Sequence, residues 1–267
     1  LITKIKKLTK DPKFPVMIDE EGETVSRLSN IINHNFSQKL FGDIYKSNRS
    51  IGEAIYRYYI DNIAKIMREI GININTVPVL DVLRKNTHKI IGSRSFSNNP
   101  KVVKLLGQTC VRQYRLNKIA TVIKHIPGHG QAKVDSHHFT PVVDIKESFL
   151  LKKDFSTFKN KKSFFAMTAH VVFKKIDNKN TVTQSKKLIK LIRDKIGFKN
   201  LLISDDLSMK SLKGTLKDNT IKTFNSGCNL ALHCNGNFKE MQIVGKNSPL
   251  ISKFIIKKTS QFYKILS

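Results

Sequence analysis

The chain has 267 residues, 40% of them hydrophobic, and a formal net charge of +28, and this length leads us to expect a single domain over residues 1–267 with a substantial core. Three scattered cysteines (Cys110, Cys228 and Cys234), no membrane-length apolar run and no signal peptide argue against a secreted or membrane protein and favour the cytoplasm. The charge is mostly lysine spread over nearly every segment, which favours a solvated basic surface over a nucleic-acid interface.

Six apolar runs of strand length follow one another along the chain, most of them rich in β-branched residues. They cover residues 14–18, 74–80, 119–123, 164–167, 201–203 and 230–232. Helical periodicity predicts a helix over 51–70 that ends before Gly71. Another helix is predicted over 188–196, between Ser185 as its N-cap and Gly197 as its stop. Strands that alternate with helices indicate βαβ units and a parallel sheet.

Polar side chains follow each of these six runs. They are Asp19-Glu20-Glu21, Asp81, Lys124-His125, His170, Asp205-Asp206 and His233-Cys234-Asn235. In a parallel barrel all strands open on one face at their carboxyl ends, where active sites are built, so this repetition predicts an α/β fold of the TIM (β/α)8 type. Six strands are evident where a complete barrel has eight. The charged segment over 152–162 is expected to be a solvated helix or loop.

The loop after the third run concentrates residue types that are common in catalysis. Over residues 126–140 it is too polar for a regular element, and Gly128 and Gly130 allow it to turn sharply. Asp135 and His137 are separated by one residue, so the carboxylate can bond the imidazole and raise its basicity. This pair is a candidate for proton transfer.

Asp205 and Asp206 lie where the fifth run ends. Neighbouring side chains on a strand point to opposite sides, so only one of them can face the mouth of a barrel. That carboxylate is a candidate nucleophile.

Cationic and hydrogen-bonding side chains adjoin several strand ends. They are Arg27, Arg94, Lys124 and His125. Grouped around one carboxylate, they suit an uncharged substrate rich in hydroxyl groups, such as a sugar.

A metal site is an alternative use of the loop. Its ligands would be His125, His129, Asp135, His137 and His138. These residues come from one loop, without the HxH or HExxH spacing of zinc enzymes. No GxSxG elbow surrounds Ser204 or Ser208, and Gly128-His129-Gly130 lacks the third glycine of a dinucleotide-binding loop. We therefore expect neither a metal nor an organic cofactor.

Short motifs surround most of these residues. They are residues 15–22 (PVMIDEEG), 78–82 (PVLDV), 91–96 (IGSRSF), 124–130 (KHIPGHG), 135–137 (DSH), 169–171 (AHV) and 204–209 (SDDLSM). In this order they resemble the motif series of glycoside hydrolase family 3, specifically its NagZ-type β-N-acetylglucosaminidases. The resemblance spans residue 14 to about residue 235, and the combination of KHIPGHG with DSH is highly specific.

The resemblance implies a role for each matching position. Asp205 corresponds to the nucleophile that forms a covalent glycosyl-enzyme. His137 matches the acid/base, with Asp135 as its partner on a mobile loop. The positions that match sugar contacts are Asp19, Arg27, Arg94, Lys124 and His125, and His170 lies in a motif that lines the same pocket.

The implied activity is that of a retaining β-N-acetylhexosaminidase. It would hydrolyse terminal, non-reducing β-linked N-acetylglucosamine from peptidoglycan fragments, as in cell-wall recycling. Its partner would be a small carbohydrate, and we expect a monomer that binds neither nucleic acid nor membrane. Within the family the alternative is a phosphorylase, in which phosphate replaces water. From another class, the alternative is a polynucleotide-binding protein on a degenerate barrel.

The chain departs from the family in two places. Glu23 and Thr24 follow Gly22 where the family usually has a second glycine and an arginine. Only residues 1–13 precede the first predicted strand, whereas family members usually have another strand and helix there. We therefore expect a catalytic barrel that is truncated at its N-terminus relative to the family, lacks the first strand and is open at that edge.

Overall fold

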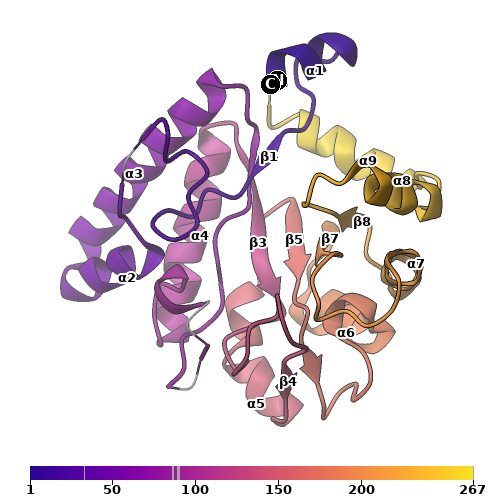
Figure 1. The fold of residues 1–267 in the computed structure, drawn as a ribbon. Helices are drawn as coiled ribbons and strands as arrows, with labels where there is room; N and C mark the ends of the chain where they lie inside the picture. The colour runs from indigo at the N-terminus through magenta and orange to yellow at the C-terminus, as the bar shows by residue number, and fades with distance from the viewer. Residues whose placement is uncertain (33, 86, 89–90, 267) are drawn as a thin grey trace.

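A six-stranded parallel sheet forms the centre of the computed structural model, which describes residues 1–32, 34–85, 87–88 and 91–266. The strand order is β1-β2-β3-β5-β7-β8. The strands are β1 (Met17–Ile18), β2 (Ile74–Asn75), β3 (Ala120–Ile126), β5 (Phe165–Thr168), β7 (Leu201–Asp206) and β8 (Leu230–Leu232). Each strand overlaps its predicted run. The sheet curls into a partial barrel, which confirms the predicted TIM-like fold (Figure 1).

Helices connect the successive strands, with α2, α3 and α4 gathered beside β1 to β3 and α7 and α8 beside β8 (Figure 1). The helices are α1 (Ile2–Leu8), α2 (Gln38–Ser47), α3 (Arg49–Glu69), α4 (Pro100–Leu116), α5 (Glu147–Lys152), α6 (Lys186–Leu191), α7 (Leu216–Ser226), α8 (Phe238–Asn247) and α9 (Lys253–Tyr263). Short 3-10 helices are η1 (Gly92–Arg94), η2 (Phe155–Phe158) and η3 (Val182–Gln184). In the described ranges, no helix is both long and apolar enough to cross a membrane.

Both helices predicted from periodicity are confirmed. The helix predicted over 51–70 is α3, and it ends next to Gly71. The helix predicted over 188–196 begins as α6 and continues as the π-helix η4 (Ile192–Ile196). Ser185 accepts a hydrogen bond from the Leu188 backbone as its N-cap, and Gly197 ends it with a φ of 81°.

Alternate residues of the strands belong to two different hydrophobic clusters. On β3, Ile123 packs in the outer cluster with the helices, whereas Val122 packs in the inner cluster. On β5, Ala166 faces outward and Met167 inward in the same way. This is the period of two that a strand imposes on its side chains. The sheet is therefore buried on both faces, as expected for a parallel barrel.

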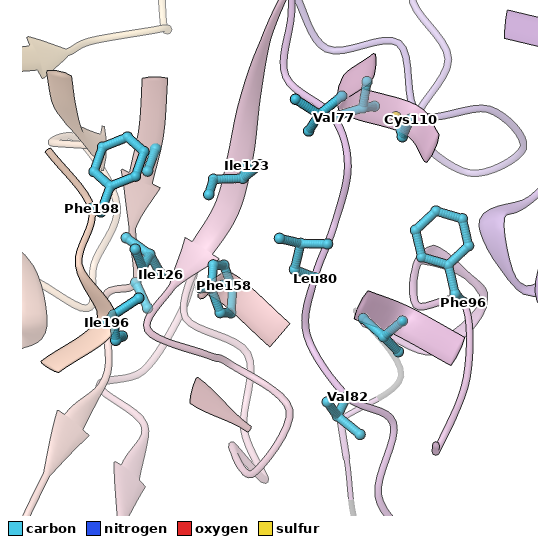
Figure 2. Packing of buried hydrophobic residues seen from close by; sticks show 14 of the residues in the cluster. Val77, Leu80, Val82, Phe96, Cys110, Ile123, Ile126, Phe158, Ile196 and Phe198 are labelled. Atoms are coloured by element: carbon cyan, nitrogen blue, oxygen red, sulfur yellow. The ribbon is translucent and has the colours of Figure 1, made fainter. Parts of the chain in front are cut away.

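The segment over 152–162 is solvated only in part: Lys152, Lys153, Asn160 and Lys162 are exposed, but the prediction of a solvated segment is wrong for its centre. It contains η2, whose Phe155 and Phe158 are almost fully buried. The Phe155 ring lies 5.2 Å from that of Phe173, and Figure 2 shows Phe158 in the same cluster as Ile126 of β3. Lysines dominate the composition of the segment, but two phenylalanines three residues apart fall on one face of a 3-10 turn.

The C-terminal helix α9 covers part of the inner face of the sheet. Phe262 is buried there, with its ring 5.7 Å from that of Phe165. The same cluster includes Met17 of β1 and Leu230 of β8, which lie at opposite edges of the sheet. The segment before β1 holds α1, and no strand precedes β1 in the described part of the chain, as predicted. A small parallel pair, β4 (Val142–Val143) with β6 (Val172–Phe173), was not predicted.

Candidate active site

A pocket of about 490 Å³ opens at the carboxyl ends of the strands. Among the predicted site residues, those that line it are Asp205, His137, Asp19, Arg27, Arg94, Lys124 and His125. The other two predicted residues bond lining residues: Asp135 bonds His137, and His170 bonds the carbonyl of Asp206. The strand ends thus bring together side chains that are far apart in the sequence, which is the arrangement that a parallel barrel predicts.

A cluster of ionic side chains forms the floor of the pocket. Glu21 is buried and bonds the Arg94 guanidinium through both oxygens, at 2.7 and 2.9 Å. The Nζ atom of Lys124 lies 2.6 Å from Glu21 and 3.0 Å from Asp19, and it donates to Thr76 at 2.7 Å. The hydroxyl of Thr76 also donates to Asp19. Each cation of the floor therefore has a carboxylate partner, as burial of charge requires.

The pKa values of the floor carboxylates follow from these pairs. Burial by itself would raise the pKa of Glu21, but the charges of Lys124 and Arg94 outweigh burial and lower it to about 2. Asp19 is affected in the same way: burial opposes ionisation, and Lys124 and the Thr76 hydroxyl lower its pKa. Both carboxylates are ionised at neutral pH, so they hold Lys124 in a fixed position between them.

Both aspartates at the end of β7 line the pocket, so the prediction that only one of them faces its mouth is wrong, but their hydrogen-bond partners differ. Asp206 is tied to its surroundings, because its oxygens accept from the backbone and hydroxyl of Ser208 and from the Cys234 backbone. Asp205 accepts only from the Asp206 backbone, at 2.8 Å, among the contacts of the described residues. Burial opposes the ionisation of Asp205, but His170 and His125 lower its pKa. Asp205 is thus a carboxylate with an oxygen available to the pocket.

His125 is oriented by a carboxylate beneath it. Its Nδ1 atom lies 2.7 Å from the buried Asp81, so Nδ1 carries the proton and Nε2 is directed away from Asp81. Asp81 also accepts from the backbone of His129 at 2.6 Å. Burial alone would raise the pKa of Asp81, but His125 lowers it and keeps the group ionised. One carboxylate therefore fixes a residue at the end of β3, His125, and a residue of the turn that follows, His129.

His170 does not line the pocket. It is fully buried, its Nε2 donates to the Asp206 carbonyl at 3.1 Å, and its Nδ1 accepts from the Thr183 hydroxyl at 2.7 Å. Burial lowers its pKa, which suits a neutral ring with this pattern of donor and acceptor. Both ring nitrogens are occupied, so this geometry leaves none for the predicted contact with substrate. His170 instead supports the backbone next to Asp205.

The Asp135 and His137 pair lies at the rim of the pocket. The Asp135 carboxylate accepts from the backbone and from Nδ1 of His137, each at 2.8 Å. The His137 side chain is 55% exposed, and Nε2 is left for the pocket. Burial opposes the ionisation of Asp135, but the two bonds from His137 lower its pKa. The hydrogen bond predicted within this pair is present.

Arg27 also lies at the rim, on a turn that a buried glutamate organises. Glu20 accepts from the backbone of Arg27 at 2.7 Å and from that of Leu28 at 2.9 Å. The departure from the family motif falls on this turn: Glu23 accepts from the Ser93 hydroxyl, beside Arg94. Glu23 therefore links two loops of the pocket.

No group of three or more His, Cys, Asp or Glu side chains is arranged to hold a metal ion in the described ranges. Three of the four histidines proposed as ligands have other partners here: Asp81 for His125, Ser136 for His129 and Asp135 for His137. These contacts assign the loop histidines to a hydrogen-bonded network.

Sequence reasoning missed three residues of the site, Glu21, Asp81 and Ser136, and named a fourth, His129, only as a possible metal ligand. Glu21 and Asp81 stand at strand ends that were noted, so the signal for them existed. However, the fold decides that Glu21 binds Arg94 and that Asp81 binds His125, and the spacing of these residues along the chain does not predict either pair. Asp81 and His125, for example, are 44 residues apart in the chain.

A family model described as "Glycosyl hydrolase family 3 N terminal domain" matches residues 9–255. The chain is similar to Beta-hexosaminidase A of Pseudoalteromonas piscicida, with 30% identity over 236 residues that cover 81% of this chain and 39% of that protein. It is also similar to Beta-hexosaminidase of Thioalkalivibrio sulfidiphilus, with 32% identity that covers 84% of this chain and 65% of that protein. The chain thus spans less than two thirds of either relative.

Among solved structures, NagZ from Neisseria gonorrhoeae in complex with N-trifluoroacetyl-D-glucosamine superimposes with a TM-score of 0.86 at 25% identity. The superposition covers 98% of this chain and 79% of that chain. Over almost the whole length of this chain, the partial barrel therefore has the same fold as that NagZ structure.

Proposed function

The chain belongs to glycosyl hydrolase family 3, and we propose that it hydrolyses terminal, non-reducing β-linked N-acetylglucosamine with retention of configuration. The observation that carries the proposal is the placement of Asp205: an ionised carboxylate with an available oxygen, in a pocket whose rim bears His137. Two relatives named beta-hexosaminidase and a structural neighbour bound to a glucosamine derivative support the substrate class. Peptidoglycan fragments in the cytoplasm are the source that we propose for this sugar.

In the first step, Asp205 attacks the anomeric carbon and the bond to the leaving oxygen breaks. His137 in its protonated form gives that oxygen a proton from Nε2, while Asp135 holds Nδ1. In the second step, neutral His137 takes a proton from water as the water oxygen attacks the anomeric carbon. Asp205 then leaves as a carboxylate. Most retaining glycosidases use a second carboxylate for the proton transfer, and the imidazole takes that role here.

The floor cluster would bind the sugar. Lys124, Arg94 and Asp19 present donors and an acceptor that are held by buried partners, so little ordering is needed when substrate hydroxyls bind. Met167 and Leu232 supply apolar lining beside them. A pocket of mixed polar and apolar lining suits one sugar ring with both hydroxyl edges and an apolar face.

The test is turnover of 4-nitrophenyl β-N-acetylglucosaminide by the purified chain. We expect release of nitrophenol, a β-configured first product by NMR, and much slower release from the matching β-glucoside. A rate that rises with phosphate, with the sugar 1-phosphate as product, would identify a phosphorylase instead. No turnover, together with salt-sensitive binding of a polynucleotide, would contradict the glycosidase and favour the nucleic-acid alternative.

A further inference from the structure

Ser136 differs from its neighbours in the loop that carries the acid/base pair. The residues around it are exposed or half-buried: Lys133, Val134, Asp135, His137, His138 and Phe139. Ser136 is 5% exposed, and its Oγ atom lies 3.2 Å from Nε2 of His129. Its side chain points into the protein, whereas the side chains on either side of it, Asp135 and His137, bond each other at the rim. Because this hydroxyl is buried and hydrogen-bonded, it fixes the position of the loop backbone at residue 136.

His129 is a rigid partner for this hydroxyl. Its side chain is buried, its backbone donates to Asp81 at 2.6 Å, and its ring lies 5.6 Å from that of His125. The Nδ1 atom is buried without a hydrogen-bond partner, so in the described part of the chain Ser136 is the polar partner of the ring. Burial, and then the proximity of His125, lower the pKa of His129 to about 4, so the ring is neutral at physiological pH.

Two further contacts dock the same loop against the segment that follows Asp205. The carbonyl of His137 accepts from the Lys210 backbone at 3.3 Å, and the Thr140 hydroxyl donates to the Ser211 carbonyl at 2.7 Å. These contacts hold the loop from His137 onward. The His129 contact holds it inside the pair, one residue from both Asp135 and His137.

We infer that His129 and Ser136 are positioning residues that hold the Asp135 and His137 pair over the pocket. The inference rests on the proposed function, in which His137 transfers the proton. Loss of the Ser136 hydroxyl would free the loop without touching Asp205 or the floor cluster. The predicted defect is therefore confined to the step that needs a proton.

The first test compares substrates with good and poor leaving groups. In Ser136→Ala we expect kcat/KM for phenyl β-N-acetylglucosaminide to fall by about five- to tenfold, the loss that one hydrogen bond accounts for. For the 2,4-dinitrophenyl glycoside, whose leaving group needs no proton, we expect a change within about twofold. His129→Leu should behave like Ser136→Ala, and His129→Gln should recover part of the loss because its amide can reach the Nε2 position.

Ser163→Ala is the matched control. Ser163 is equally buried and donates to the Thr121 carbonyl at 2.6 Å, but it precedes β5 at the strand end opposite the pocket. We expect it to cost stability with no dependence on the leaving group. Equal losses on both substrates in Ser136→Ala, or the same pattern in Ser163→Ala, would overturn the inference.

A second measurement does not depend on turnover. In Ser136→Ala and His129→Leu, amide hydrogen exchange over residues 133–139 should be faster than in the wild type, and Ser163→Ala should leave it unchanged. Unchanged exchange in both loop variants would refute the positioning role. Wild-type turnover of the aryl glycoside is measured separately, so failure of the proposed function is distinguished from failure of this inference.

Discussion

The floor and the rim of the pocket are built in different ways. On the floor, Glu21 and Arg94 are 73 residues apart in sequence, and both are held in a buried ion cluster at strand ends. At the rim, Asp135 and His137 are two residues apart on a loop, and the histidine is 55% exposed. The floor depends on the fold for every partner, whereas the rim pair forms within one turn.

The difference separates two tasks. Groups that bind a substrate and stabilise charge work best when they are already in place, because their reorganisation would cost free energy during the reaction. A group that covers the substrate and transfers a proton must move aside for the substrate to enter, and a loop allows that movement. Substitutions on the floor should therefore affect every substrate, and those at the rim only the steps that need a proton.

Removal of Asp205, which stands at the end of β7 beside the floor cluster, is the strongest test of the groups that the fold holds in place. We expect Asp205→Ala to lower kcat for an aryl β-N-acetylglucosaminide by at least about 10⁴-fold, as loss of a covalent nucleophile does, with an unchanged fold. The measurement is nitrophenol release beside a circular dichroism spectrum. Asp206→Ala is the control, and we expect a smaller loss because Asp206 bonds Ser208 and Cys234. An inactive Asp206→Ala beside an active Asp205→Ala would reverse the assignment.

Removal of His137 tests the rim. We expect His137→Ala to slow substrates with poor leaving groups by about 10²–10⁴-fold, the usual contribution of general acid–base catalysis, and good leaving groups far less. Azide, which needs no general base, should partly restore breakdown of the glycosyl-enzyme. Asp135→Asn should show a milder form of the same pattern. A uniform loss across a leaving-group series, without rescue by azide, would mean that His137 only positions the substrate.

Neutralising Glu21 should show how far the floor depends on its buried charges. Glu21→Gln leaves Arg94 and Lys124 without their shared carboxylate, so we expect the free energy of unfolding to fall by about 3–5 kcal/mol. Asp43→Asn is the matched control, since Asp43 also pairs with two cations, Lys39 and Lys46, but on the surface. Its cost should be below about 1 kcal/mol. Similar losses in urea unfolding would contradict the contrast between buried and exposed clusters.

The free energy of unfolding should depend on pH through the buried imidazole of His129, which lies below the rim. The pKa of His129 falls from 6.5 in the unfolded chain to about 4 in the fold, through burial and His125, against the opposing charges of Asp81 and Asp205. As the pH falls, His129 takes up a proton in the unfolded chain before it does so in the fold. The free energy of unfolding is therefore unaffected by His129 above about pH 6.5 and decreases as the pH falls from there towards 4. We expect a loss of about 2 kcal/mol between pH 7 and pH 5.

His129→Gln provides the control for that loss, because glutamine does not titrate. The slope of unfolding free energy against pH should become smaller in this variant, with the remainder due in part to His170, whose pKa is lowered by burial. An unchanged slope would show that His129 is not the group responsible.

The sequence was informative wherever the signal is local. Apolar runs of strand length located the six strands, and the motifs after them supplied most of the pocket lining. It failed at η2, where lysines masked two buried phenylalanines, and at His170, which follows a strand like the other site residues but bonds Thr183 and the Asp206 carbonyl instead of lining the pocket. In both places the direction of a side chain depended on what packs against it.

The sequence by itself determined the order of strands and helices, the chemical groups at each strand end, and the Asp135 and His137 pair. These follow from preferences that act over a few residues. Only the tertiary structure decided which of the two aspartates lining the pocket keeps an oxygen available, that Glu21 joins Arg94 to Lys124, and that His129 meets Ser136. The physical reason is burial: a desolvated charge or hydrogen-bonding group must find a partner, and the fold, not the spacing along the chain, brings that partner within reach.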